Sequence, residues 1–222
     1  MKYTSLFLAT LTIPTILIIP AMALEVQITP NIESVKVMHN GKEVVIKRNQ
    51  QQNHIINQDF AKTSRICPPF CIQPMTLASG IETIGELELL DYLKKVSYGD
   101  NSILVIDSRT PKWVIKGSIP GAVSIPWDLI SGAKSSPPIV NKLLVELLGV
   151  KISKQGKNFE GVKTLVLFCN GPWSNQSSSN IKALLKLGYP PEKLKWYRGG
   201  IQAWELFGLT TVTDIPMPWL GF

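Results

Sequence analysis

Cys169 is the residue of this chain best placed for nucleophilic chemistry. It follows the apolar run 164–168 directly, and a helical pattern begins eight residues later at Ser177. A cysteine between a buried strand and a helix N-terminus faces unpaired backbone N–H groups, and these favour the thiolate over the thiol. The thiolate is the nucleophilic form of the side chain. The competing interpretation is a small buried core cysteine that only continues the strand, and position alone leaves both open.

The segment between Cys169 and the helix is the expected substrate-binding loop. Gly171 lets its backbone turn and Pro172 stiffens it, and the loop carries no charged residue. Trp173 either walls a pocket against water or packs the loop onto the domain. The predicted loop residues are Asn170, Gly171, Pro172, Trp173, Ser174, Asn175, Gln176 and Ser177.

Asp107 and Arg109 stand at the end of a second apolar run, Ile103–Ile106. An ion pair at the end of a strand holds neighbouring loops in place, and we favour this supporting role for both residues. The alternative is direct contact with the substrate.

Alternating strand and helix patterns position these residues. Short apolar runs predict strands, and runs with helical periodicity, several closed by glycine, predict helices between them. Thr83 and Glu86 form a capping box at the start of the first helix. The order predicts an α/β fold, a parallel sheet with helices on both faces, in which ligands bind beyond the carboxyl ends of the strands. The predicted strands are 103–106, 122–125, 164–168 and 194–197, and the predicted helices follow 83–86 and span 139–148, 177–187 and 201–207.

Four pieces between residues 81 and 213 resemble the rhodanese family, in the family's order. They are Val105-Ile106-Asp107-Ser108-Arg109, Gly117-Ser118-Ile119-Pro120-Gly121-Ala122, the strand that ends in Cys169, and Gly199-Gly200-Ile201-Gln202-Ala203-Trp204. Each piece is weak alone, and together they form a specific signal.

The resemblance implies sulfur transfer. A Cys169 thiolate attacks the outer sulfur of a small sulfane donor, holds it as a persulfide and passes it to a thiol acceptor, with no cofactor. The alternative is a non-catalytic module of the same fold that carries sulfur or binds a partner.

The loop departs from the family's pattern. Members of the family commonly carry cations in this loop, whereas residues 170–179 have none, and Gln176 stands near a usual cation position. The Gly-His-Ile-Pro piece has Ser118 in place of its histidine. An uncharged loop predicts weak use of the thiosulfate dianion, and it argues against phosphatase chemistry, which needs an arginine to clamp phosphate.

The N-terminus has the pattern of a secretion signal. Lys2 precedes an apolar stretch, Ala21-Met22-Ala23 forms a cleavage site, and no charge occurs between Lys2 and Glu25. An uncleaved anchor is the alternative, but the stretch is short and carries Pro14 and Pro20. We expect a signal peptide at 1–23, no stable membrane insertion after cleavage, and a periplasmic or secreted protein.

Residues 24–80 read as an extension before the domain at 81–213, with a tail at 214–222. Two β-branched runs around Asn40-Gly41 predict a hairpin with a type I′ turn, with His39 as a polar turn residue. Residues 49–59 read as a polar loop. The hairpin could also bind a protein partner.

Three cysteines in an exported protein suggest one disulfide and one free thiol. Cys67 and Cys71 are close in sequence, with two prolines between them, so we expect a structural disulfide; a redox exchange with Cys169 is the alternative.

The remaining composition excludes two classes of site. His39 and His54 are too few and too isolated to predict a metal site. The net charge of +7 comes from dispersed lysines and not from a basic run, so we expect no nucleic-acid binding.

Overall fold

A computed structural model describes residues 26–65, 72, 74–132 and 134–221. The expected signal peptide and its cleavage site, together with Cys67 and Cys71, lie outside the described residues.

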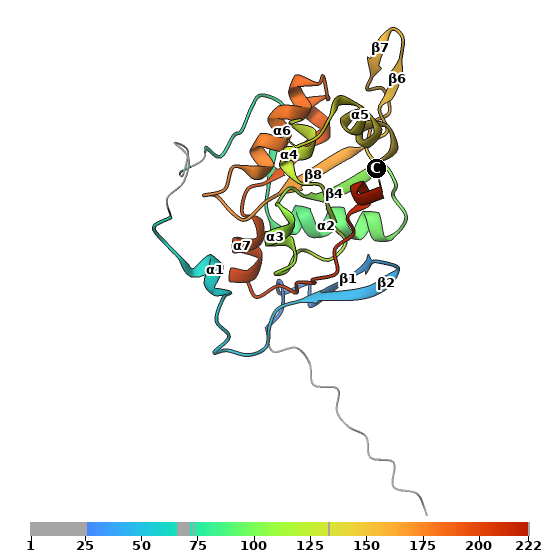
Figure 1. The fold of residues 1–222 in the computed structure, drawn as a ribbon. Coiled ribbons are helices and arrows are strands. Elements are labelled where there is room, and N and C mark those ends of the chain that lie inside the picture. Colours follow the sequence, from blue (N-terminus) through green and yellow to red (C-terminus); the bar gives the residue numbers. More distant parts are fainter. Residues whose placement is uncertain (1–25, 66–71, 73, 133, 222) are drawn as a thin grey trace, which may run out of the picture.

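Five parallel strands form the central sheet, in the order β3-β9-β8-β4-β5 (Figure 1). The middle strand is β8 (Thr164–Phe168), and its neighbours are β4 (Ile103–Asp107) and β9 (Leu194–Tyr197). The outer strands are β3 (Glu82–Ile84) and β5 (Val123–Ser124). The predicted α/β fold is confirmed, with β8 and β9 at their predicted bounds.

Helices cover both faces of this sheet (Figure 1). Leu165 and Leu167 of β8 belong to one core and Val166 to the other, as expected for a strand buried on both sides. The first core includes residues of α4 (Trp127–Ile130), α5 (Pro137–Glu146) and α6 (Gln176–Lys186), and the second those of α2 (Glu86–Ser97) and α7 (Gly200–Leu206). The shorter helices are α1 (Gln58–Ala61), α3 (Pro111–Val114) and the 3₁₀ turns Pro191–Lys193 and Pro218–Gly221.

The N-terminal hairpin consists of β1 (Ser34–His39) and β2 (Lys42–Lys47). Asn40 and Gly41 have φ angles of 49° and 72°, the positive pair that the predicted type I′ turn requires. Val37 and Ile46 are buried in the same core as α2, so the hairpin is packed onto the domain.

His39 directly precedes the Asn40-Gly41 turn, as predicted, but its ring is not exposed to solvent. It ends β1 and is buried, and its Nδ1 accepts the backbone N–H of Gly121 at 3.1 Å. The packing of the hairpin against the domain, which local sequence does not show, buries the ring.

The helix start near residue 85 also differs from the prediction. Thr83 lies in β3, where it pairs with Trp196, and Gly85 is the N-cap of α2. The Glu88 side chain accepts the N–H of Gly85 at 3.0 Å, so the capping contact begins two residues later than predicted.

Two short features had no sequence signal. β6 (Lys151–Ser153) and β7 (Gly156–Asn158) form a small exposed hairpin without an apolar face. α1 lies at the end of the segment predicted as a polar loop.

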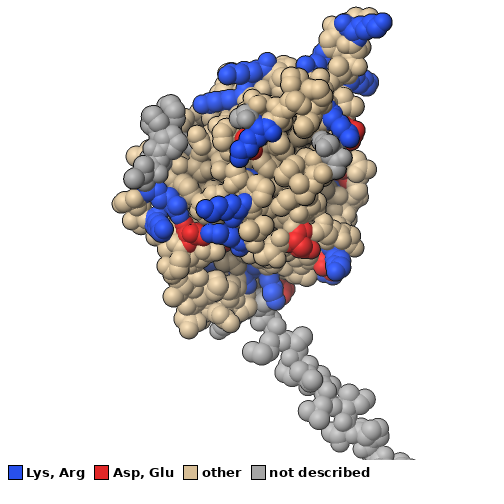
Figure 2. Space-filling view, viewed as in Figure 1, with Lys and Arg blue, Asp and Glu red and all other residues tan. Residues whose placement is uncertain are grey.

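The distribution of charged side chains on the surface agrees with the predicted dispersed lysines. On the face in Figure 2, Lys and Arg side chains are scattered and form no single stripe. Among the described residues, no helix is both long enough and apolar enough to cross a bilayer.

Candidate active site

Cys169 lies at the carboxyl end of β8, at the centre of the sheet. The backbone N–H of Ser108, just beyond β4, donates to the Phe168 carbonyl at 2.9 Å, which joins the two strand ends. The cysteine is a free thiol with only 2% of its surface exposed. The sulfur therefore sits beneath its loop, at the edge of the sheet where α/β proteins bind ligands.

A hydroxyl group contacts the sulfur. Ser177, in the first turn of α6, donates from Oγ to Cys169 Sγ at 3.0 Å, and Trp196 of β9 donates from Nε1 to the same Oγ at 3.1 Å. Because the indole N–H occupies a lone pair of the hydroxyl, the hydroxyl proton is directed to the sulfur. A hydrogen bond donated to sulfur stabilises a thiolate.

Two backbone carbonyls also lie near the sulfur. Cys169 Sγ is 3.6 Å from the Ser174 oxygen and 4.0 Å from the Gly171 oxygen. The prediction placed backbone N–H groups around the sulfur, whereas its hydrogen bonds in the described part of the chain involve one hydroxyl and two carbonyls. The site can hold both forms of the side chain, since a thiol donates to a carbonyl and a thiolate accepts from Ser177.

The start of α7 is hydrogen-bonded to the backbone of the Cys169 loop. The N–H groups of Ile201 and Gln202 donate to the carbonyls of Cys169 and Asn170 at 3.0 and 2.9 Å. Gly200 has a φ of +59°, and a Cβ on it would lie 2.4 Å from the Cys169 oxygen. The second glycine of the Gly-Gly-x-x-x-Trp piece is therefore where the helix touches the backbone of the loop.

Asp107 and Arg109 form a fully buried ion pair at 2.7 Å. Arg109 also donates from Nη2 to the Gly117 carbonyl at 2.6 Å and from Nη1 to Asn170 Oδ1 at 3.5 Å. Ser118 donates from Oγ to Asp107 Oδ2 at 2.6 Å. The pair thus joins the Gly-Ser-Ile-Pro turn to the first residue of the loop, which supports a positioning role and not contact with substrate.

Trp173 packs the loop onto the domain. Its Nε1 donates to Gln202 Oε1 at 3.0 Å, and its ring centroid lies 6.0 Å from that of Trp113. The same Gln202 donates from Nε2 to the carbonyl of Phe60 in α1 at 3.0 Å. One glutamine therefore links the loop to the N-terminal extension.

The other loop residues lie at its outer edge. Asn175 is exposed, while Pro172 and Gln176 are half-buried. Gln176 Oε1 is a buried acceptor without a partner among the described residues.

Sequence reasoning missed Trp196 and Gln202. Trp196 reads as an apolar residue of a buried strand, and nothing local indicates that its indole N–H reaches Ser177. Gln202 lies at one of the variable positions of the Gly-Gly-x-x-x-Trp piece, so the resemblance gave it no role.

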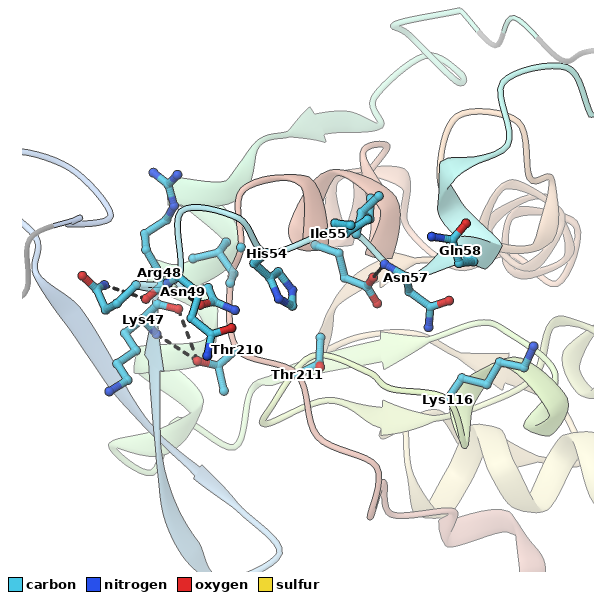
Figure 3. A pocket seen from close by; sticks show the side chains of 16 residues that line it. Lys47, Arg48, Asn49, His54, Ile55, Asn57, Gln58, Lys116, Thr210 and Thr211 are labelled. Atoms are coloured by element: carbon cyan, nitrogen blue, oxygen red, sulfur yellow. Dashed lines mark hydrogen bonds between the residues drawn. The ribbon is translucent and has the colours of Figure 1, made fainter.

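A polar groove lies elsewhere on the molecule, lined by residues of 47–58, by Lys116, and by Glu205 and residues 208–211 (Figure 3). Burial raises the pKa of the Glu205 carboxyl within it, and the Asn57 N–H that this carboxyl accepts opposes the shift only in part. No residue of the Cys169 loop lines this groove. It is separate from the site of the sulfur.

The described ranges contain no group of three His, Cys, Asp or Glu side chains that could bind a metal.

Comparison with known proteins finds one matching family and several similar structures. A family model described as a rhodanese-like domain matches residues 89–206. Among solved structures, a human single-domain sulfurtransferase is 20% identical, with 56% of this chain and 95% of that chain covered and a TM-score of 0.38. A Bacillus halodurans protein is 23% identical, with coverage of 56% and 72% and a TM-score of 0.38. A Pseudomonas aeruginosa thiosulfate sulfurtransferase is 17% identical, with coverage of 62% and 21% and a TM-score of 0.40. None of the curated proteins matches.

Proposed function

Because the chain belongs to the rhodanese-like domain family, we propose that it is an exported sulfurtransferase that carries sulfane sulfur as a persulfide on Cys169. The observation that carries the proposal is the position of this free thiol at the end of the central strand, with the Ser177 hydroxyl donating to its sulfur. A cysteine with no role beyond packing does not need a hydroxyl directed at it by a buried indole.

The reaction has two halves. The Cys169 thiolate attacks the outer sulfur of a small donor such as thiosulfate. A new S–S bond forms at Cys169, the donor's S–S bond breaks, and its electron pair leaves with sulfite. A thiolate acceptor then attacks the terminal sulfur of the persulfide and takes it as its own persulfide, so that the electron pair of the broken bond returns to Cys169 as thiolate. Neither half needs a cofactor, and the attacking group in each half is a thiolate.

The surrounding residues have distinct roles in this scheme. Ser177 stabilises negative charge on the sulfur before and after transfer. The Asp107–Arg109 pair and α7 hold the loop, so that the Ser177 hydroxyl stays within hydrogen-bond distance of the Cys169 sulfur.

Export rests on the N-terminal pattern at 1–23, and a disulfide between Cys67 and Cys71 would suit an oxidising compartment. Non-reducing peptide mapping of protein from such a compartment should find these two cysteines joined. Free thiols at both positions would count against the disulfide.

A second candidate function follows from the burial of the sulfur. With only 2% of Cys169 exposed, a non-catalytic module that holds sulfur for a partner, docked through the hairpin extension, would also keep a persulfide safe from water. Turnover separates the two: a carrier loads once and releases sulfur only to its partner, while an enzyme continues with small thiols.

Peptide mass spectrometry after exposure to sulfane donors tests the proposal. Glutathione persulfide or thiosulfate should add one sulfur to the Cys169 peptide, and Cys169→Ser should abolish the addition. Equal loading of the Cys169→Ser protein, or no loading of the parent from any donor, would refute the proposed function.

A further inference from the structure

The N-terminal extension places a cation against the loop that has none of its own. The guanidinium carbon of Arg65 lies 4.0 Å from the centre of the Trp173 ring and 5.9 Å from that of Trp113. At the shorter distance a guanidinium is held over an aromatic face by cation–π attraction and stacking. Arg65 is 104 positions before Cys169 in the chain, yet it touches the middle of the Cys169 loop.

Several contacts fix the segment that carries Arg65. Phe60 is buried in the core that contains residues of α2 and α7, and its ring centroid lies 5.9 Å from that of Trp113. The Phe60 carbonyl accepts from Gln202, which accepts in turn from Trp173. The position of Arg65 therefore follows from the same packing that positions the loop.

The charge of Arg65 acts on the nearby Asp59 carboxylate without forming an ion pair with it in the part of the chain that the structure describes. Its Nε and Nη2 are buried there without a hydrogen-bond partner, and no ion pair involves it. The other cation near these rings, Lys116, is paired with Asp59. Buried N–H donors without acceptors are unfavourable, and an anionic ligand would supply the missing acceptors.

We infer that Arg65 is the residue that recognises anions at the Cys169 site, and that it supplies from the extension the positive charge absent from residues 170–179. The inference rests on the proposed function. It narrows the donor to a class with negative charge near the sulfur that is transferred, such as thiosulfate or another sulfonated sulfane. It also makes Arg65, a residue of the N-terminal extension, a part of the active site.

Two reagents with the same reactive group and different charge test this inference, each compared between the parent and the variants. Methanethiosulfonates react with a thiolate at their sulfenyl sulfur, form a mixed disulfide and release methanesulfinate. The rate of modification of the Cys169 peptide is followed by mass spectrometry with neutral methyl methanethiosulfonate and with anionic sulfonatoethyl methanethiosulfonate. Arg65→Gln should lower the ratio of the anionic to the neutral rate by about threefold to tenfold, the effect of one partly screened charge.

Two further variants separate charge from packing. Lys62→Gln removes an exposed charge from the same segment that makes none of the described cation–π contacts with Trp113 or Trp173, and it should leave the ratio unchanged within about twofold. Arg65→Lys keeps the charge without the planar stack and should retain most of the preference for the anion. In steady-state assays Arg65→Gln should raise the KM for thiosulfate by about tenfold to a hundredfold with kcat nearly unchanged, because a charge-assisted hydrogen bond to bound substrate is lost.

The outcomes distinguish this inference from the proposed function. If Arg65→Gln behaves as Lys62→Gln does, or if no reagent reaches Cys169, Arg65 is not the anion-recognising residue. The proposed function stands as long as Cys169 of the parent still acquires sulfur from a donor. If the parent never acquires sulfur, the proposed function fails whatever the ratio shows.

Discussion

Replacing Gly200 with alanine should damage both the stability of the domain and the reactivity of Cys169. An alanine Cβ at this position would lie 2.4 Å from the Cys169 oxygen, 2.8 Å from the Gly171 nitrogen and 2.9 Å from the Asn170 carbonyl carbon. These are backbone atoms of the active loop and cannot rotate away. The loop or the start of α7 must move, and the hydrogen bonds from Ile201 and Gln202 to the loop must lengthen.

Two contributions make up the expected loss of stability. A non-glycine residue at φ +59° costs about 1–2 kcal/mol, and overpacking against a fixed backbone adds about 1–3 kcal/mol. Gly149→Ala is the matched control, because Gly149 has φ +81° and the nearest atom to an added Cβ is 3.9 Å away. It should show only the first contribution, about 1–2 kcal/mol.

Urea unfolding of both variants measures these losses, and persulfide loading of the Cys169 peptide measures the effect on the site. Gly200→Ala should lose about 1–3 kcal/mol more than Gly149→Ala and should load sulfur at least about tenfold more slowly, since displacing a reacting group by about 1 Å costs up to a hundredfold. Equal unfolding free energies and equal loading rates in the two variants would show that the close approach of Gly200 to the loop is unnecessary.

Three other predictions follow from the contacts of the site and core. Ser177→Ala should slow alkylation of Cys169 at neutral pH by about tenfold or more, since a hydrogen bond to a charged group contributes about 1.5–3 kcal/mol; an unchanged rate would remove Ser177 from the mechanism. Asp107→Asn should lower the free energy of unfolding by about 3–5 kcal/mol, because it leaves Arg109 buried without a counter-charge, and a urea midpoint equal to the parent's would contradict this. Burial, and then the adjacent Glu86 carboxylate, raise the pKa of Tyr197 above its ordinary range. The contribution of Tyr197 to the free energy of unfolding should therefore be level below about pH 10 and fall above it, because only the unfolded state releases this proton there. Tyr197→Phe should reduce that fall, as measured by urea unfolding across alkaline pH.

Much of the fold was predictable because its signals are local. The apolar run 164–168 and the helix after it depend on neighbours within one turn or one strand, and both were predicted within a residue of their bounds. The Asn40-Gly41 turn follows from backbone preferences of two residues. Thr83 shows the limit of such reasoning, since pairing with β9, more than a hundred residues away, placed it in a strand and not at a helix cap.

Sequence alone determined at which end of the sheet Cys169 lies, because a strand runs directly into it and a helix follows. Only the tertiary structure decided what surrounds its sulfur. The indole that directs Ser177 at the sulfur comes from β9, and the cation over Trp173 comes from the extension. Both contacts join residues distant in the chain, and their geometry is set by how the cores pack, which no local pattern of residue types encodes.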